Sequence, residues 1–293
     1  MATKLWTLHF MRICLANLLL FMSLYLLYPV LPVMMASRLG VPVCLTGVFF
    51  LLFTLAWFFF GPFHAYLVDV YKRKYICMLS FGVMVAATAG YTLVQNATHL
   101  LMLCIVQGLS FGMAATAGIT LAIDITNSTF RSAGNVVFSW AARLGMIIGA
   151  ALGVYLFRTH GFETLLYVAV ALGALGILFV SRVYVPFRAP IGMKVCSMDR
   201  FLLLRGLIPA FNLILIAFIP GLMLPVLAGA PSDVPVGGET VPFFALVGCG
   251  FLLSVLIVKL FFRYDNKMWL QIVVGLVTVI GSMAMLFSPE TSW

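Results

Sequence analysis

The chain has 293 residues, of which 64% are hydrophobic and only 9% are charged. Soluble domains carry about 25% charged residues, so this composition excludes a water-soluble globular protein. The net charge of +9 does not indicate nucleic-acid binding, because the basic residues gather in short loops between apolar runs, where they orient a membrane protein.

About 20 consecutive apolar residues form one membrane-spanning helix, and the chain contains nine such segments. Their approximate limits are 9–35, 45–68, 75–95, 99–124, 133–157, 163–186, 203–229, 241–262 and 268–288. The longest polar interruption, 188–202, predicts a cytoplasmic linker. We therefore expect a six-helix N-terminal half (1–187) and a partial C-terminal half of three helices (203–293).

Basic residues predict the orientation of these spans, because Lys and Arg are retained in the cytoplasmic loops. With the N-terminus inside, fourteen Lys and Arg residues lie at the cytoplasmic face, and only Arg38 and Arg158 lie at the far face. We therefore expect a multi-pass protein of the bacterial cytoplasmic (inner) membrane, with a cytoplasmic N-terminus.

The loop between the second and third spans reads GPFHAYLVDVYKRK, from Gly61 to Lys74. The carboxylate of Asp69 is costly at the membrane edge unless it has a partner, and the basic triplet after it can supply one. The loop resembles the signature Gly-x-Leu-Ala-Asp-Arg-x-Gly-Arg-Arg of the major facilitator superfamily of secondary transporters. Matching residues are Leu67, Asp69, Arg73 and Lys74, whereas Ala65, Val70 and Lys72 depart from the pattern.

The fourth span extends the resemblance through Gln107, Gly108 and Gly112. The family's pattern in this helix begins with an arginine that is linked to proton coupling. Cys104 stands at that position here. The resemblance therefore does not imply a conventional proton relay.

The loop after the fourth span is similar to the family's Asp…Arg pattern, with the matching residues Asp124 and Arg131. The resemblance implies a charge cluster at the cytoplasmic ends of spans two to five. Its members would be Asp69, Arg73, Lys74, Asp124 and Arg131. One interpretation is a latch that stabilises the outward-facing state, and the other is that these charges only orient the helices.

Gly145, Gly149 and Gly153 lie four residues apart in the fifth span. Small residues at this spacing share one helix face and allow another backbone to approach closely. The stretch also resembles the family's fifth-helix antiporter pattern, with Ala150 where the pattern has Pro. The spacing therefore predicts close helix packing, and a specific antiporter role is the alternative.

Arg143 is the one basic residue well inside a span. Arginine at a helix centre costs roughly 2.5–3.5 kcal/mol, so this side chain should face the bundle interior or a wet cavity. No acidic residue lies at the same depth, which indicates contact with a substrate or coupling ion, and a structural pairing is the alternative.

Other polar or aromatic side chains within the spans are candidates for a cavity lining. They are Asn17, Tyr25, Gln107, Trp140 and Asn212. Helix–helix hydrogen bonding and plain packing are the alternative interpretations of each.

The sequence contains no catalytic motif, phosphate loop or cluster of metal-ligating side chains. Its six cysteines are scattered without a CxxC pair, which favours a packing role over a metal or disulfide role. We therefore predict that the protein is not an enzyme, that it binds no metal or cofactor, and that a gradient rather than ATP drives any transport.

The resemblance implies an all-α polytopic membrane protein with a major-facilitator-type bundle of about nine transmembrane helices. The implied function is secondary active efflux or exchange of a small molecule by alternating access in the lipid bilayer, with a proton or cation as the coupling ion. The alternative is a non-transporting membrane protein or an inactive fragment. Because the family has twelve helices, we expect a chain truncated after nine, with a natural nine-span protein as the other possibility.

Overall fold

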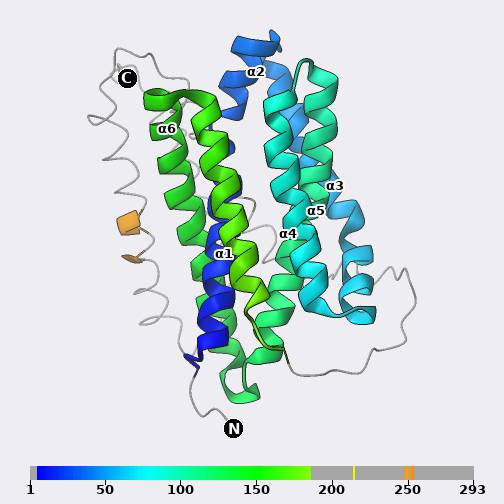
Figure 1. Ribbon diagram of the computed structural model, residues 1–293, viewed down its shortest axis with the longest axis vertical. Coiled ribbons are helices and arrows are strands. Elements are labelled where there is room, and N and C mark those ends of the chain that lie inside the picture. Colours follow the sequence, from blue (N-terminus) through cyan, green and yellow to red (C-terminus); the bar gives the residue numbers. More distant parts are fainter. Residues whose placement is uncertain (1–4, 186–213, 215–247, 251, 254–293) are drawn as a thin grey trace. The chain divides into compact units, whose positions relative to one another are not determined.

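The computed structural model describes residues 5–185, 214, 248–250 and 252–253. It divides the chain into two units, Met1–Phe201 and Leu202–Trp293, and nearly all described residues belong to the first. The described elements are all helical. They are α1 (Leu8–Leu27), α2 (Leu31–Leu39), α3 (Val43–Val70), α4 (Arg73–Gly90), the short η1 (Tyr91–Leu93), α5 (Ala97–Ile125), the short η2 (Ser128–Phe130) and α6 (Arg131–Ser181) (Figure 1).

Five helical stretches of the described residues are long and apolar enough to cross a membrane. The last covers Ser128–Ser181, more than twice the length that one crossing requires. Its chain reverses at Gly161, whose φ of 83° favours glycine, so α6 contains two crossings. The six spans predicted for residues 9–186 therefore match helices within several residues, and the prediction of an all-α membrane protein is confirmed. The other three predicted spans, the linker and Asn212 lie outside the described residues, except for isolated positions.

The first predicted span, 9–35, is not one helix. It is divided at a turn between Tyr28 and Val30 into α1 and α2. Pro29 lies in the turn and Pro32 lies in the first turn of α2. Neither proline can donate a backbone hydrogen bond, so a continuous helix is disfavoured here although the sequence stays apolar.

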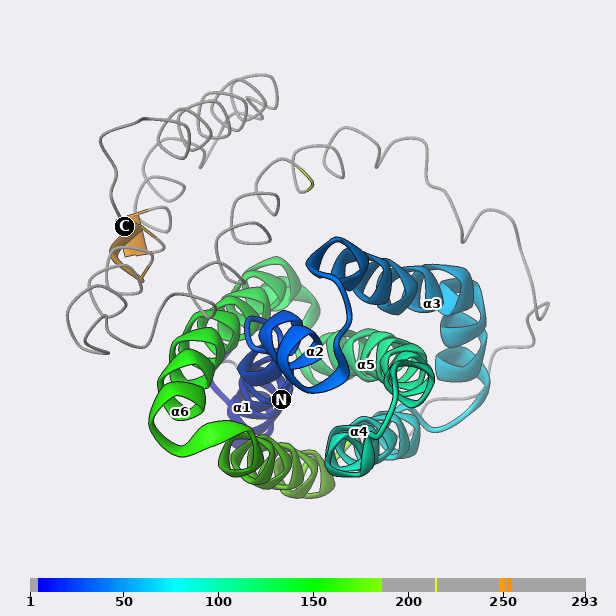
Figure 2. The same cartoon turned by 90° about the horizontal axis from the view of Figure 1, so that it is seen from above.

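Two pairs of parallel helices organise the described unit. Seen from above, α1 lies between α6 and α5, and α3 packs against α5 (Figure 2). Gly145, Gly149 and Gly153 of α6 approach the α1 backbone at positions that are also four residues apart. Gly108 of α5 likewise approaches the α3 backbone at Phe53, and Gly112, four residues later, meets the side chain of Trp57. Constant spacing on both partners means that each pair runs in parallel at a fixed register.

Candidate functional site

Three charged side chains meet where α3, α4 and α5 end or begin. Arg73, the first residue of α4, donates from Nη1 to both carboxylate oxygens of Asp124 at 2.8 and 2.7 Å. Its Nη2 donates to Oδ1 of Asp69 at 3.1 Å. The side chains of Arg73 and Asp124 are 12% exposed, and that of Asp69 is 24% exposed. We call Asp69, Arg73 and Asp124 the bridge cluster.

The helix register explains why the two carboxylates meet. Gly108 and Gly112 lie beside Phe53 and Trp57, and the two aspartates follow about three turns further along each helix. Two partly buried carboxylates at the same level would repel each other. One guanidinium therefore compensates both, and its Nε also donates to the backbone oxygen of Val68 at 3.2 Å.

Lys74 and Arg131 do not take part in the ion pairs of the described residues. Lys74 donates from Nζ to the backbone oxygen of Ser181 at 2.7 Å, at the C-terminal end of α6. Consecutive residues of a helix point about 100° apart, so Arg73 is directed to α3 and α5 while Lys74 is directed to α6. Arg12 of α1 likewise donates to the oxygen of Arg182 at 2.8 Å. Arg131 is exposed at the start of α6.

The three glycines of the fifth predicted span lie directly against α1. A Cβ added at Gly149 would lie 2.6 Å from the backbone oxygen of Met22. A Cβ at Gly145 or Gly153 would collide with the corresponding oxygen of Leu18 or Leu26. Any side chain at these positions would separate the two helices, so the glycines have the geometry of a close-packing stripe.

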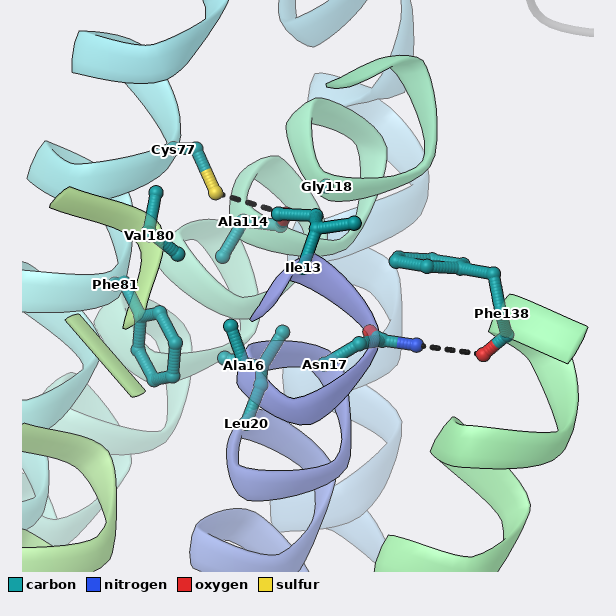
Figure 3. Close-up of a pocket in the computed structure, with 10 residues that line it drawn as sticks. All are labelled: Ile13, Ala16, Asn17, Leu20, Cys77, Phe81, Ala114, Gly118, Phe138 and Val180. Carbon is teal, nitrogen blue, oxygen red and sulfur yellow. Dashed lines mark hydrogen bonds between the residues drawn. The ribbon is translucent and has the colours of Figure 1, made fainter. Parts of the chain in front are cut away.

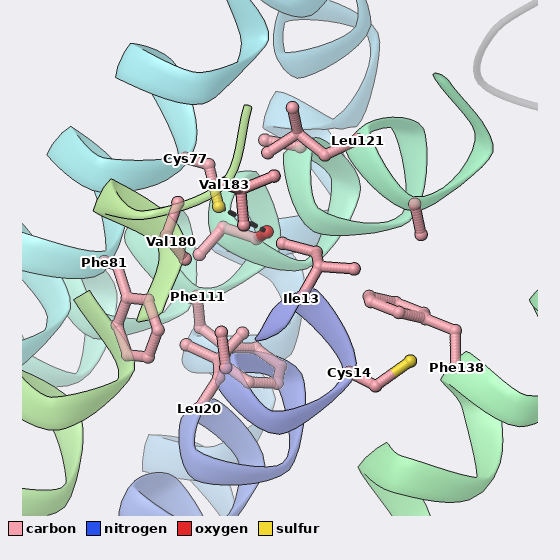
Figure 4. Close-up of a cluster of buried hydrophobic side chains, with 14 of the residues drawn as sticks. Ile13, Cys14, Leu20, Cys77, Phe81, Phe111, Leu121, Phe138, Val180 and Val183 are labelled. Carbon is pink, nitrogen blue, oxygen red and sulfur yellow. Dashed lines mark hydrogen bonds between the residues drawn. The ribbon is translucent and has the colours of Figure 1, made fainter. Parts of the chain in front are cut away.

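Asn17 is buried in the centre of the described unit, at 5% exposure. Its Nδ2 donates to the backbone oxygen of Phe138 at 3.0 Å and so joins α1 to α6 (Figure 3). The adjoining cavity has a volume of about 10 Å³, no more than one water molecule requires. Apolar side chains of α1, α4, α5 and α6 surround it (Figure 4). Asn17 thus has the geometry of a helix–helix hydrogen bond.

Gln107 belongs to a buried polar network between α4, η1 and α5. Its Oε1 accepts from the hydroxyl of Tyr91 at 2.8 Å, and its Nε2 donates to Oγ1 of Thr88 at 3.1 Å. The Tyr91 hydroxyl also lies 3.5 Å from Sγ of Cys104. Sequence reasoning missed Tyr91 and Thr88, because a tyrosine and a threonine near a helix end give no signal of a buried partner.

A small cavity of about 20 Å³ lies beside this network. Apolar and aromatic side chains of α1, α2 and α3 form its other wall, including Tyr28 and Phe50. Tyr25 is half-buried and stacks on Tyr28, with ring centroids 5.3 Å apart. Gln107 therefore borders a cavity, whereas Tyr25 contacts a residue that does.

The remaining predicted residues lie on α6 or outside the described part. Trp140 is half-buried and Arg143 is exposed. Sequence reasoning also missed Gly173 and Gly176, where an added Cβ would collide with Val85 and Phe81 of α4. His64 is 1% exposed, and its Nδ1 has no hydrogen-bond partner among the described residues. None of these residues is brought into the bridge cluster.

The described residues contain no group of three or more His, Cys, Asp and Glu side chains that could hold a metal ion. Cys14, Cys77 and Cys104 are buried free thiols. The Sγ of Cys77 lies 3.9 Å from the backbone oxygen of Ala114. These three cysteines therefore take part in packing between the helices.

A family model described as Major Facilitator Superfamily matches residues 13–293 of the chain. A search of curated proteins finds no match. Many solved structures are similar in fold. The POT family transporter PepTSo has a TM-score of 0.57 and 10% identity, covering 98% of this chain and 72% of that one.

The second is a bacterial homolog of the human lysosomal transporter Spinster, in an inward-facing and unoccupied conformation. Its TM-score is 0.62 at 14% identity, covering 100% of this chain and 71% of that one. The third is the human organic anion transporter MFSD10 (TETRAN). Its TM-score is 0.52 at 18% identity, covering 94% of this chain and 71% of that one. At these identities the likeness establishes a shared fold.

Proposed function

Because the chain belongs to the Major Facilitator Superfamily, we propose that it carries a small molecule across a membrane by gradient-driven efflux or exchange. The observation that carries this proposal is the family match over residues 13–293. The family and the long apolar helices make the chain a multi-pass membrane protein of a transporter family with the major facilitator fold. Transporters of this kind are generally not enzymes.

The proposed location is the cytoplasmic membrane of a bacterium, with the N-terminus inside. The excess of basic residues at one end of the predicted spans supports this orientation. The bridge cluster, Lys74 and Arg131 would then lie at the cytoplasmic face. The proposed organisation is a six-helix half, a linker over 188–202, and a second half that begins near residue 203.

The proposed mechanism is alternating access, with the bridge cluster as a latch. Arg73 bonds to carboxylates from two other helices, so separating the ends of α3, α4 and α5 would break these contacts together. A partly buried charge that loses its partner is destabilised. The ion pairs at these helix ends are therefore suited to two discrete states, one with all pairs formed and one with the helix ends separated. Breaking and remaking the bridge would accompany movement of the helix ends.

The proposed cavity lining includes Gln107, Trp140 and Arg143. The polar network around Gln107 would contribute uncharged hydrogen-bonding groups to this lining. Cys104 takes the place of the family's arginine and lies beside Tyr91. We therefore do not assign a coupling proton or cation to this position.

Transport by the purified full chain in liposomes tests the proposal. Uptake of a panel of anionic, cationic and neutral solutes would be measured under an imposed pH gradient, a sodium gradient, or no gradient. The proposal predicts that at least one solute enters faster than in protein-free liposomes, and that one gradient accelerates entry. Correctly inserted, monodisperse protein that moves no solute above background would contradict it.

A further inference from the structure

Arg143 places a positive charge near the middle of a membrane crossing. The first crossing of α6 begins at Arg131 and ends at the kink at Gly161. Arg143 lies about 18 Å along this helix at ~1.5 Å per residue. The hydrocarbon core is about 30 Å thick, so Arg143 lies inside it and not at either membrane surface.

Among the described residues, no carboxylate forms an ion pair with Arg143. The chain has eight Asp and Glu residues. In the described part, Asp69 and Asp124 belong to the bridge cluster, and Glu163 is exposed beside the kink at Gly161. The other five fall outside the predicted spans: Asp199, Asp233, Glu239, Asp265 and Glu290. No acidic residue falls within a predicted span at the depth of Arg143, so an anionic group of a ligand can serve as its counter-ion.

Polar side chains precede Arg143 on its own face of α6. Gly145 is buried against α1, whereas Arg143 is exposed. Ser139 and Asn135 precede Arg143 by four and eight residues, so the three side chains follow one another along the same helix face. Polar and charged side chains within a membrane crossing mark a wet surface and not a lipid contact.

We propose that Arg143 binds the anionic group of the transported molecule, and that the substrate class is organic anions with a carboxylate, sulfonate or phosphate group. This inference rests on the proposed transport function. The planar guanidinium matches the oxygens of such groups with two parallel hydrogen bonds. Trp140, three residues earlier, is half-buried on the neighbouring surface and offers an apolar indole to the body of the ligand.

Two permanently charged ligands of similar size test the proposal by thermal denaturation of the detergent-solubilised full chain. p-Toluenesulfonate should raise the melting midpoint, and phenyltrimethylammonium should not. Arg143→Gln should weaken the sulfonate response by about tenfold or more, whereas Arg143→Lys should keep only part of it, since lysine keeps the charge but not the two parallel hydrogen bonds. Arg182→Gln, a change of an exposed arginine at the end of α6, should leave the response unchanged.

The melting midpoint of Arg143→Gln without ligand distinguishes ligand binding by Arg143 from a structural role of this residue. Without ligand, Arg143→Gln should melt no lower than the wild type, because Arg143 forms no ion pair with the described residues. A midpoint several degrees lower would assign Arg143 to a structural pair and overturn the proposal. Equal sulfonate responses of the wild type and Arg143→Gln, or the absence of a response in the wild type, would also overturn it.

Uptake of the same two ligands into liposomes distinguishes this inference from the proposed function. Sulfonate uptake that requires Arg143 would support both. Uptake of the cation alone, unaffected by Arg143→Gln, would leave transport established and overturn the anionic substrate class. Sulfonate binding that requires Arg143, with no uptake of any solute, would support the anion site and contradict the proposed transport function.

Discussion

The guanidinium of Arg73 bonds to both carboxylate oxygens of Asp124, at 2.8 and 2.7 Å, although the two residues are 51 positions apart in the chain. A third side chain, that of Asp69, shares the same guanidinium at 3.1 Å. The ends of α3 and α5 are therefore joined through the first residue of α4. This arrangement makes the bridge cluster the clearest target for mutation in the described part of the chain.

Arg73→Gln should destabilise the protein by about 2 kcal/mol or more, because it leaves two partly buried carboxylates without their common partner. Thermal denaturation in detergent measures the effect. The double variant Arg73→Gln/Asp124→Asn should be more stable than Arg73→Gln alone, since one of the two unpaired carboxylates is then replaced by a neutral amide. Equal melting midpoints for the wild type and Arg73→Gln would show that the bridge contributes nothing to stability.

Gly149→Ala should destabilise the packing of α1 against α6 by about 1–3 kcal/mol, because its Cβ would meet the Met22 oxygen at 2.6 Å. The matched control is Gly82→Ala in α4, where an added Cβ has no neighbour within 4 Å. The control should be neutral or stabilising by up to about 1 kcal/mol, since alanine favours the helix more than glycine does. Identical effects of the two changes would contradict the close-packing stripe.

Tyr91→Phe should cost about 1–3 kcal/mol, because it leaves the Gln107 oxygen buried without this donor. Tyr75→Phe is the control, since Tyr75 is 63% exposed. Thermal denaturation of both variants compares the two hydroxyls directly. If removing the Tyr91 hydroxyl has no more effect than removing that of Tyr75, the network is not important for stability.

A cysteine at Lys72 should react with a membrane-impermeant maleimide only from the cytoplasmic side, in a background in which the six native cysteines are replaced by serine. Lys72 is exposed at the start of α4. A cysteine at Ser37, which is exposed near the end of α2, should react only from the opposite side. Labelling of intact cells and inside-out vesicles distinguishes the two sides, and the reverse pattern would refute the proposed orientation.

The sequence predicted the crossings of the first unit because long apolar runs are a strong signal. It did not predict the break of the first span, since Pro29 and Pro32 lie within an uninterrupted apolar stretch. The close packing at Gly149 could be predicted from spacing alone, because residues four apart share a helix face. Gly173 and Gly176 contact the side chains of Val85 and Phe81 of α4, but their shorter spacing is not distinctive.

Partners of polar side chains were harder to predict than helices. The resemblance pointed to Asp69, Arg73 and Asp124, which the structure brings together. It also grouped Lys74 with them, but the direction of Lys74 depends on its rotation about α4 and on the position of α6. Asn17 could equally have lined a cavity or joined two helices. Only the arrangement of the helices around Asn17 distinguishes these two roles.

The central claim, transport governed by the bridge cluster, is tested most directly by the initial rate of solute exchange in liposomes that contain the full chain. The rate would be compared among the wild type, Arg73→Asp, and Arg73→Asp combined with Asp124→Arg. The account predicts exchange by the wild type, a rate at least about tenfold lower for Arg73→Asp, and partial recovery when the opposite charges are exchanged. Undiminished exchange by folded Arg73→Asp, or no exchange by the wild type, would contradict it.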